Sequence, residues 1–217
     1  MCFSATASFC ASAVLVVVGT MTWKSTRNRR ELLFASIPLL FAAQQFIEGV
    51  IWQTLQHDRL HAVMTLAYVF FSHVFWPVFV PIAVLFLEPA GPRRRALAVL
   101  VAIGAIVSAW LLEQSLVHGV TSRPVAQHIE YVSPHPFAVL STALYVLATS
   151  ASLLLSSHRT VKLFGILTLL SFVAAYAFYT RWFVSVWCYF AALLSGVVLL
   201  HFRTRLPHTA SFRVPLT

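Results

Sequence analysis

Charged residues are scarce in this sequence, and few polar segments interrupt its long apolar runs. Only 10% of the 217 residues are Asp, Glu, Lys or Arg, whereas 59% are hydrophobic. Soluble domains contain about 25% charged and 45–50% apolar residues. So little charge cannot cover a core of this size with a surface that faces water. The composition therefore excludes an ordinary soluble domain and predicts an all-α, polytopic membrane bundle whose main partner is the lipid bilayer.

Cysteine is also rare, and no basic residue precedes the first apolar run. Three cysteines, an odd number, do not make a disulfide framework. A secretory signal would carry a basic segment before its apolar run and a small-residue cleavage site after it. We therefore expect the first run to remain as a membrane span, with Cys2 at its outer end.

Seven apolar runs are long enough to cross a bilayer, whose core of about 30 Å needs about 20 helical residues. They predict a single seven-helix domain over residues 1–202. The expected spans lie near 4–23, 32–54, 62–87, 96–112, 137–155, 163–180 and 182–202. The sixth and seventh runs meet at Thr180-Arg181, so six spans with one re-entrant segment is the alternative.

The basic residues predict an orientation. Twelve of the 15 Lys and Arg residues lie in the connections after spans one, three and five or in the tail; only Arg59, Arg123 and Arg181 lie in the other connections. Because cytoplasmic connections carry the excess of Lys and Arg, we expect an outer N-terminus and a short, basic cytoplasmic tail at 203–217. A multi-pass protein of the inner (plasma) membrane follows. The net charge of +9 then needs no nucleic acid as partner.

Glu48 lies inside the second predicted span, in the segment LLFAAQQFIEGVIW. A carboxylate at that depth costs on the order of 3 kcal/mol, so it should face the bundle interior or a cavity. Gln44, Gln45 and Trp52 lie three or four residues away, on the same helical face. This group predicts a ligand, proton or metal site. The alternative is a protonated acid that bonds between helices and serves packing alone.

Spans three and seven each add one candidate at a similar depth. In FFSHVFWPVFVP, Pro77 lacks an amide donor and its ring clashes with the carbonyl of His73, so a bend beside His73 is expected. In span seven, Ser185 and Cys188 belong to a small-residue stripe that also favours close helix packing. We expect Glu48, His73 and Cys188 to approach a common pocket. The alternatives are a structural kink and a packing stripe.

A divalent metal ion is the one cofactor that the sequence suggests. His57 and His61 in HDRLH have the four-residue spacing that places two imidazoles on one helical face. If Met1 is removed, the thiol and α-amine of Cys2 form a pair that suits a soft metal. The remaining candidate ligands come from HIEYVSPH in the outer connection: His128, Glu130 and His135.

Four segments carry a family resemblance: MCFSATASF, QQFIEG, WPVFVP and SVWCYFAALLS. They make the chain similar to a family of uncharacterised bacterial multi-span membrane proteins, over most of its length. The resemblance implies an integral membrane fold and no assigned activity. Rhodopsins differ, because the only lysines, Lys24 and Lys162, lie at cytoplasmic edges and leave none for retinal.

Three functions remain open on the sequence. The leading hypothesis is binding or transport of a small solute or metal ion in an outward-facing polar pocket under the connection 113–136. The second is a membrane-embedded metal-dependent hydrolase, in which the metal activates water and Glu48 acts as general base. The third is a structural or signalling bundle whose polar residues only fix helix packing.

Overall fold

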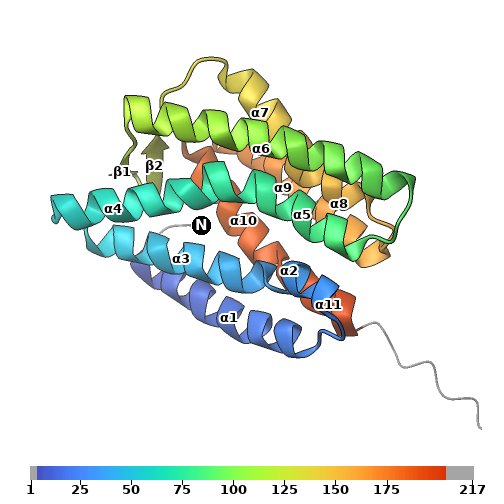
Figure 1. The fold of residues 1–217 in the computed structure, drawn as a ribbon. Coiled ribbons are helices and arrows are strands. Elements are labelled where there is room, and N and C mark those ends of the chain that lie inside the picture. The colour runs from blue at the N-terminus through green and yellow to red at the C-terminus, as the bar shows by residue number, and fades with distance from the viewer. Residues whose placement is uncertain (1–3, 204–217) are drawn as a thin grey trace, which may run out of the picture.

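The computed structural model describes residues 4–203, which form an all-α bundle built around seven long apolar helices (Figure 1). Each is long and apolar enough to cross a membrane, so the chain has the features of a multi-pass membrane protein. The seven are Ala5–Lys24, Arg29–Gln53, Asp58–Leu87, Pro92–His118, Ala138–Leu155, Arg159–Phe178 and Thr180–Arg203. The prediction of an all-α bundle is confirmed.

Several of these helices consist of shorter elements that follow one another directly. The second contains a 3-10 turn, η1 (Arg29–Glu31), followed by α2 (Leu32–Ala35) and α3 (Ile37–Gln53); the third contains α4 (Asp58–Val69), η2 (Phe70–Phe75) and α5 (Trp76–Leu87). The fifth contains α7 (Ala138–Val146), η3 (Leu147–Ala151) and α8 (Ser152–Leu155); the seventh contains η4 (Thr180–Trp182), α10 (Phe183–Leu194) and α11 (Gly196–Arg203). The other three are single helices: α1 (Ala5–Lys24), α6 (Pro92–His118) and α9 (Arg159–Phe178).

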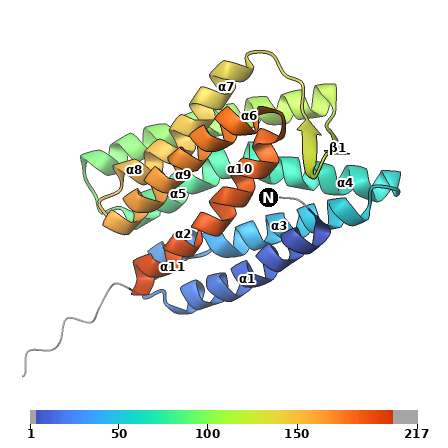
Figure 2. The same cartoon turned by 180° about the vertical axis from the view of Figure 1, so that it is seen from behind.

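The long helices alternate in direction, so their connections gather at two ends (Figure 1). One end, here the hairpin end, carries the only two strands among residues 4–203. These strands pack against α4, η4 and α10. Seen from behind, α10 and α11 run between the α1–α3 pair and α9 (Figure 2). The seventh helix therefore joins the two sides of the bundle.

The hairpin consists of β1 (Thr121–Val125) and β2 (His128–Val132), paired antiparallel with Arg123 opposite Glu130. A connection was expected over 113–136. In the structure α6 continues to His118, because residues 113–118 include no helix breaker, and it ends at Gly119 with φ of 73°. Glycine adopts such a positive φ readily because it has no Cβ.

Small residues bring α1 close to α3. The Ser12 hydroxyl donates to the Ala42 carbonyl at 2.8 Å. At Gly19 an added Cβ would meet the Leu39 side chain and backbone within 3 Å, so only glycine fits there. Lipid tails are as apolar as the helix surfaces, so the hydrophobic effect does not drive helices together in a membrane. Helices there associate largely through such close packing.

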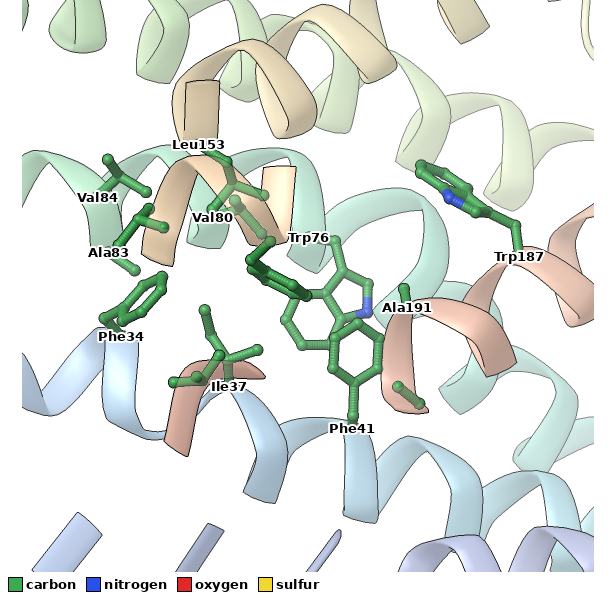
Figure 3. Close-up of a cluster of buried hydrophobic side chains, with 14 of the residues drawn as sticks. Phe34, Ile37, Phe41, Trp76, Val80, Ala83, Val84, Leu153, Trp187 and Ala191 are labelled. Atoms are coloured by element: carbon green, nitrogen blue, oxygen red, sulfur yellow. The ribbon is translucent and has the colours of Figure 1, made fainter. Parts of the chain in front are cut away.

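A buried aromatic cluster fills the centre between α2, α3, α5, α8 and α10 (Figure 3). Its middle is the pair Phe41 and Trp76, stacked with ring centroids 4.1 Å apart. Phe34, Val84 and Leu153 extend the cluster away from the hairpin end, and each is almost fully buried. This core fixes α5 relative to α3 and thereby positions His73, which lies just before α5.

The third span is irregular where the sequence predicts a bend. Phe70–Phe75, which includes His73, is a π-helical segment. Pro77 follows this segment directly, near the start of α5, and because Pro has no amide hydrogen the helical hydrogen bond to the preceding turn is missing there. Pro81 lies inside α5, and the carbonyl four residues before it belongs to Pro77. Gly104 of α6 packs directly against that carbonyl, which leaves no room for a Cβ.

Candidate functional site

A cavity of about 230 Å³ lies toward the hairpin end, between η2, α6, α7, α10 and the segment that leads from β2 to α7. Its polar lining residues are Ser72, His73, Tyr131, Ser133, His135, Ser141, Thr142 and Tyr145. The remaining lining residues are Leu111, Ala138, Phe183, Val184, Trp187 and Cys188. A pocket that combines aromatic walls with a few polar groups is typical of a small-molecule site.

His73 enters the cavity from the π-helical segment η2. Its Nδ1 lies 2.8 Å from the Ser72 hydroxyl, which in turn donates to the Val69 carbonyl at 3.3 Å. The hydroxyl hydrogen can go to either partner, and the tautomer of His73 follows from that choice. In both tautomers Nε2 can form one hydrogen bond, as donor or as acceptor. Within residues 4–203 His73 makes no other hydrogen bond.

His135 enters the same cavity from the segment before α7. Its Nδ1 donates to the Ser133 carbonyl at 2.7 Å, and its Nε2 lies 3.2 Å from the Ser141 hydroxyl. The ring meets Trp110 edge to face, with centroids 5.5 Å apart. His135 was expected among the metal ligands of the outer connection; in the structure it shares a cavity with His73.

Glu48 lies beside this cavity but does not line it. The carboxylate is fully buried; its Oε1 accepts a hydrogen bond from the Ser185 hydroxyl at 2.7 Å and a long one from the Tyr131 hydroxyl at 3.5 Å. Tyr131 stacks on Tyr68, with centroids 4.3 Å apart and planes 3° apart. Of the three residues expected to share a pocket, His73 and Cys188 line it and Glu48 lies behind Tyr131.

The other residues predicted around Glu48 are divided among separate contacts. Gln44 accepts a hydrogen bond from the Trp76 indole at 2.7 Å and also contacts the Cys188 thiol. Gln45 is fully buried, and its amide makes no hydrogen bond within the described part of the chain. Trp52 packs against a second small core that includes Ile51 and Cys188. These residues form a polar layer behind the cavity and do not line it.

The predicted metal ligands do not gather. His57 precedes α4 and has non-helical dihedrals, so it does not share a helical face with His61. His61 Nε2 donates to the Ser122 carbonyl at 3.1 Å, which ties α4 to the hairpin. Among residues 4–203, no group of three His, Cys, Asp or Glu side chains could hold a metal ion. Cys2 lies outside the described residues.

Glu130 and His128 instead attach the hairpin to the start of the seventh helix. Arg181 Nε donates to Glu130 at 2.8 Å and Arg123 Nε at 2.6 Å, and these bonds lower the pKa of the Glu130 carboxyl. The His128 ring packs against Trp182 with centroids 4.9 Å apart. Burial lowers the pKa of His128 and so favours its neutral form. Both groups therefore stabilise the docked hairpin near neutral pH.

Several lining residues were not singled out from the sequence. Tyr131, Ser133, Ser141, Thr142 and Tyr145 are common residue types and carry no motif. The one available signal is the spacing of Ser141, Thr142 and Tyr145, which places three hydroxyls near one face of an otherwise apolar span. The contribution of Tyr131 depends on a hairpin that the sequence analysis did not predict.

The chain matches, over residues 1–213, the family described as Family of unknown function (DUF6629). It belongs to that family. The expected relationship to an uncharacterised family is confirmed, and DUF6629 membership brings no assigned activity with it. No curated protein and no solved structure matches the chain significantly. A function for this DUF6629 member must therefore be argued from its own cavity.

Proposed function

We propose that the protein binds a small solute within the membrane, in the 230 Å³ cavity near the hairpin end. The observation that supports this most directly is the lining itself, in which eight of 14 residues carry a polar side chain. Polar groups inside a span are costly unless they meet a partner. A polar solute in the cavity would supply such partners to the lining groups.

We further propose that the cavity opens toward the outside of the cell. The connections at the opposite end, together with the tail, hold twelve of the 15 basic residues, and cytoplasmic connections carry such an excess. In the proposed orientation the hairpin lies over the outer entrance, in the inner membrane. Metal-dependent hydrolysis is not proposed, because residues 4–203 offer no ligand group for its metal.

The experiment compares three tryptophan substitutions on α7. Thr142 lines the cavity, so Thr142→Trp fills it; Ala138→Trp is a second filling variant from the same wall. Val139 is 81% exposed and does not line the cavity, so Val139→Trp is the matched control. Saturation-transfer NMR on protein in nanodiscs would measure binding of benzamide, benzoate, benzamidine and toluene.

We expect at least one of these probes to bind the wild type and Val139→Trp and to lose most of its signal in both filling variants. Circular dichroism and thermal unfolding establish that each variant is folded. If no probe shows binding that depends on the cavity while the filling variants remain folded, the proposed function is wrong.

A further inference from the structure

We infer that the solute is uncharged, about the size of a substituted single ring, and held by hydrogen bonds as well as by aromatic contact. This inference rests on the proposed function and adds the class of ligand. It depends on three properties of the cavity: the charge of its lining, the hydrogen-bonding groups that remain unused, and its aromatic wall.

The lining contains no Asp, Glu, Lys or Arg. Glu48 is separated from the cavity by Tyr131 and already accepts hydrogen bonds from Ser185 and Tyr131. An ionic solute would therefore lose its hydration on entering the cavity and gain no Asp, Glu, Lys or Arg partner in return, which is strongly unfavourable. A neutral solute avoids that cost.

Four lining groups have unused hydrogen-bonding capacity within residues 4–203. The Ser133 hydroxyl oxygen is buried and makes no hydrogen bond. The hydroxyls of Thr142 and Tyr145 line the cavity and form none within the described chain, and His73 Nε2 forms none there either. Hydroxyls both donate and accept, and Nε2 does one or the other according to the tautomer. This set suits a ligand that offers both a donor and an acceptor.

The other wall is aromatic. Phe183 and Trp187 lie nearly parallel, with centroids 5.5 Å apart and planes 19° apart, and Tyr145 meets Trp187 edge to face at 5.5 Å. A protein cavity of about 150 Å³ holds benzene, so 230 Å³ holds a single ring that carries a polar substituent. Flat aromatic walls favour a flat apolar body.

The test uses three ligands of almost the same shape: benzamide is neutral, benzoate is negative and benzamidine is positive. Dissociation constants are measured at pH 8, where histidine side chains are ordinarily uncharged. Binding to Thr142→Trp is subtracted as background. We expect benzamide to bind at least tenfold more tightly than either ion. Tyr145→Phe should weaken benzamide three- to tenfold and change toluene by less than twofold.

The outcomes separate this inference from the proposed function. Cavity-dependent binding of benzoate or benzamidine that equals or exceeds that of benzamide would overturn the neutral class and leave the binding site standing. Equal affinity for toluene and benzamide, or a Tyr145→Phe variant that binds both unchanged, would overturn the hydrogen-bonding part. Absence of any binding sensitive to Thr142→Trp and Ala138→Trp would instead refute the proposed function.

Discussion

Glu48 links three elements at the scale of single side chains. It belongs to α3, and its Oε1 receives hydrogen bonds from Ser185 on α10 and Tyr131 on β2. Tyr131 in turn forms part of the cavity wall. We therefore propose Glu48 as a residue that positions Tyr131 in the proposed site.

Ser185→Ala tests how much this network contributes to stability. We expect it to lower the free energy of unfolding by about 1–3 kcal/mol, because the buried Glu48 carboxyl loses its short hydrogen bond. Equilibrium unfolding in mixed micelles provides the measurement. The matched control is Ser171→Ala, since Ser171 donates only to the Thr168 carbonyl three residues earlier in the same helix. Equal effects of the two substitutions would contradict a stabilising role for the Glu48 bond.

The sequence predicts the depth of a polar side chain better than its direction. Depth follows from counting residues along a span, and on that basis His73 and Cys188 were expected at one level. The structure places both on one cavity. Direction around the helix could not be counted, because the π-helical segment at His73 changes the residue periodicity. His135 reaches the cavity from outside the helices, where no periodicity applies.

Among the elements, α5 and α6 approach each other at one fixed point. A Cβ added at Gly104 would collide with the Pro77 carbonyl, whereas a Cβ added at Gly196 would have no atom within 4 Å. Small residues commonly allow such close helix contacts in membranes.

Gly104→Ala should therefore lower the free energy of unfolding by about 1–3 kcal/mol, as overpacking does in a dense core. Gly196→Ala, the matched control, should be neutral or slightly stabilising because alanine favours helix more than glycine. Thermal and chemical unfolding of both variants provide the comparison. A neutral Gly104→Ala would contradict the close α5–α6 contact.

The hairpin contributes the pH-dependent element. Glu130 has a lowered pKa in the folded protein because Arg181 and Arg123 donate to it. Its contribution to docking is therefore complete above its ordinary pKa of 4.5 and disappears as the pH falls through the lowered value. The two arginine side chains are more than half exposed, so the effect is local and reduced by solvent screening.

Glu130→Gln should increase hydrogen exchange in β1 and β2 about two- to fivefold at pH 7. Acidification below pH 4 should reduce the protection of the same strands in the wild type, measured relative to the intrinsic exchange rate at each pH. Exchange in α3 should not change. The measurement is hydrogen–deuterium exchange followed by mass spectrometry. Unchanged hydrogen exchange of β1 and β2 in Glu130→Gln would show that the ion pairs do not stabilise the hairpin.

At the scale of the whole molecule, apolar run length was the most informative property of the sequence. It predicted an all-α bundle, and seven long apolar helices are present. It could not predict how the helices pack, because nearly every face of a lipid-exposed helix is apolar. The β-hairpin was also missed, since its five-residue strands are too short and too polar to show a clear alternation.

Topology is tested with single cysteines at the two ends. In a background that lacks Cys2, Cys10 and Cys188, His57→Cys lies at the hairpin end and Arg93→Cys at the opposite end, both exposed. We expect an impermeant maleimide to label His57→Cys in intact cells and Arg93→Cys only after lysis. The reverse pattern would contradict the proposed orientation and turn the cavity toward the cytoplasm.

The π-helical segment at Phe70–Phe75 takes up one residue more than a regular α-helical turn. A residue lost within that segment would remove the extra residue and leave the helix after it nearly in place. α5 is regular α-helix, so a residue lost inside it would rotate everything after it by about 100° about the axis. The side chains beyond the deletion would then face the wrong neighbours. In α5, a lost codon would do more damage than most substitutions.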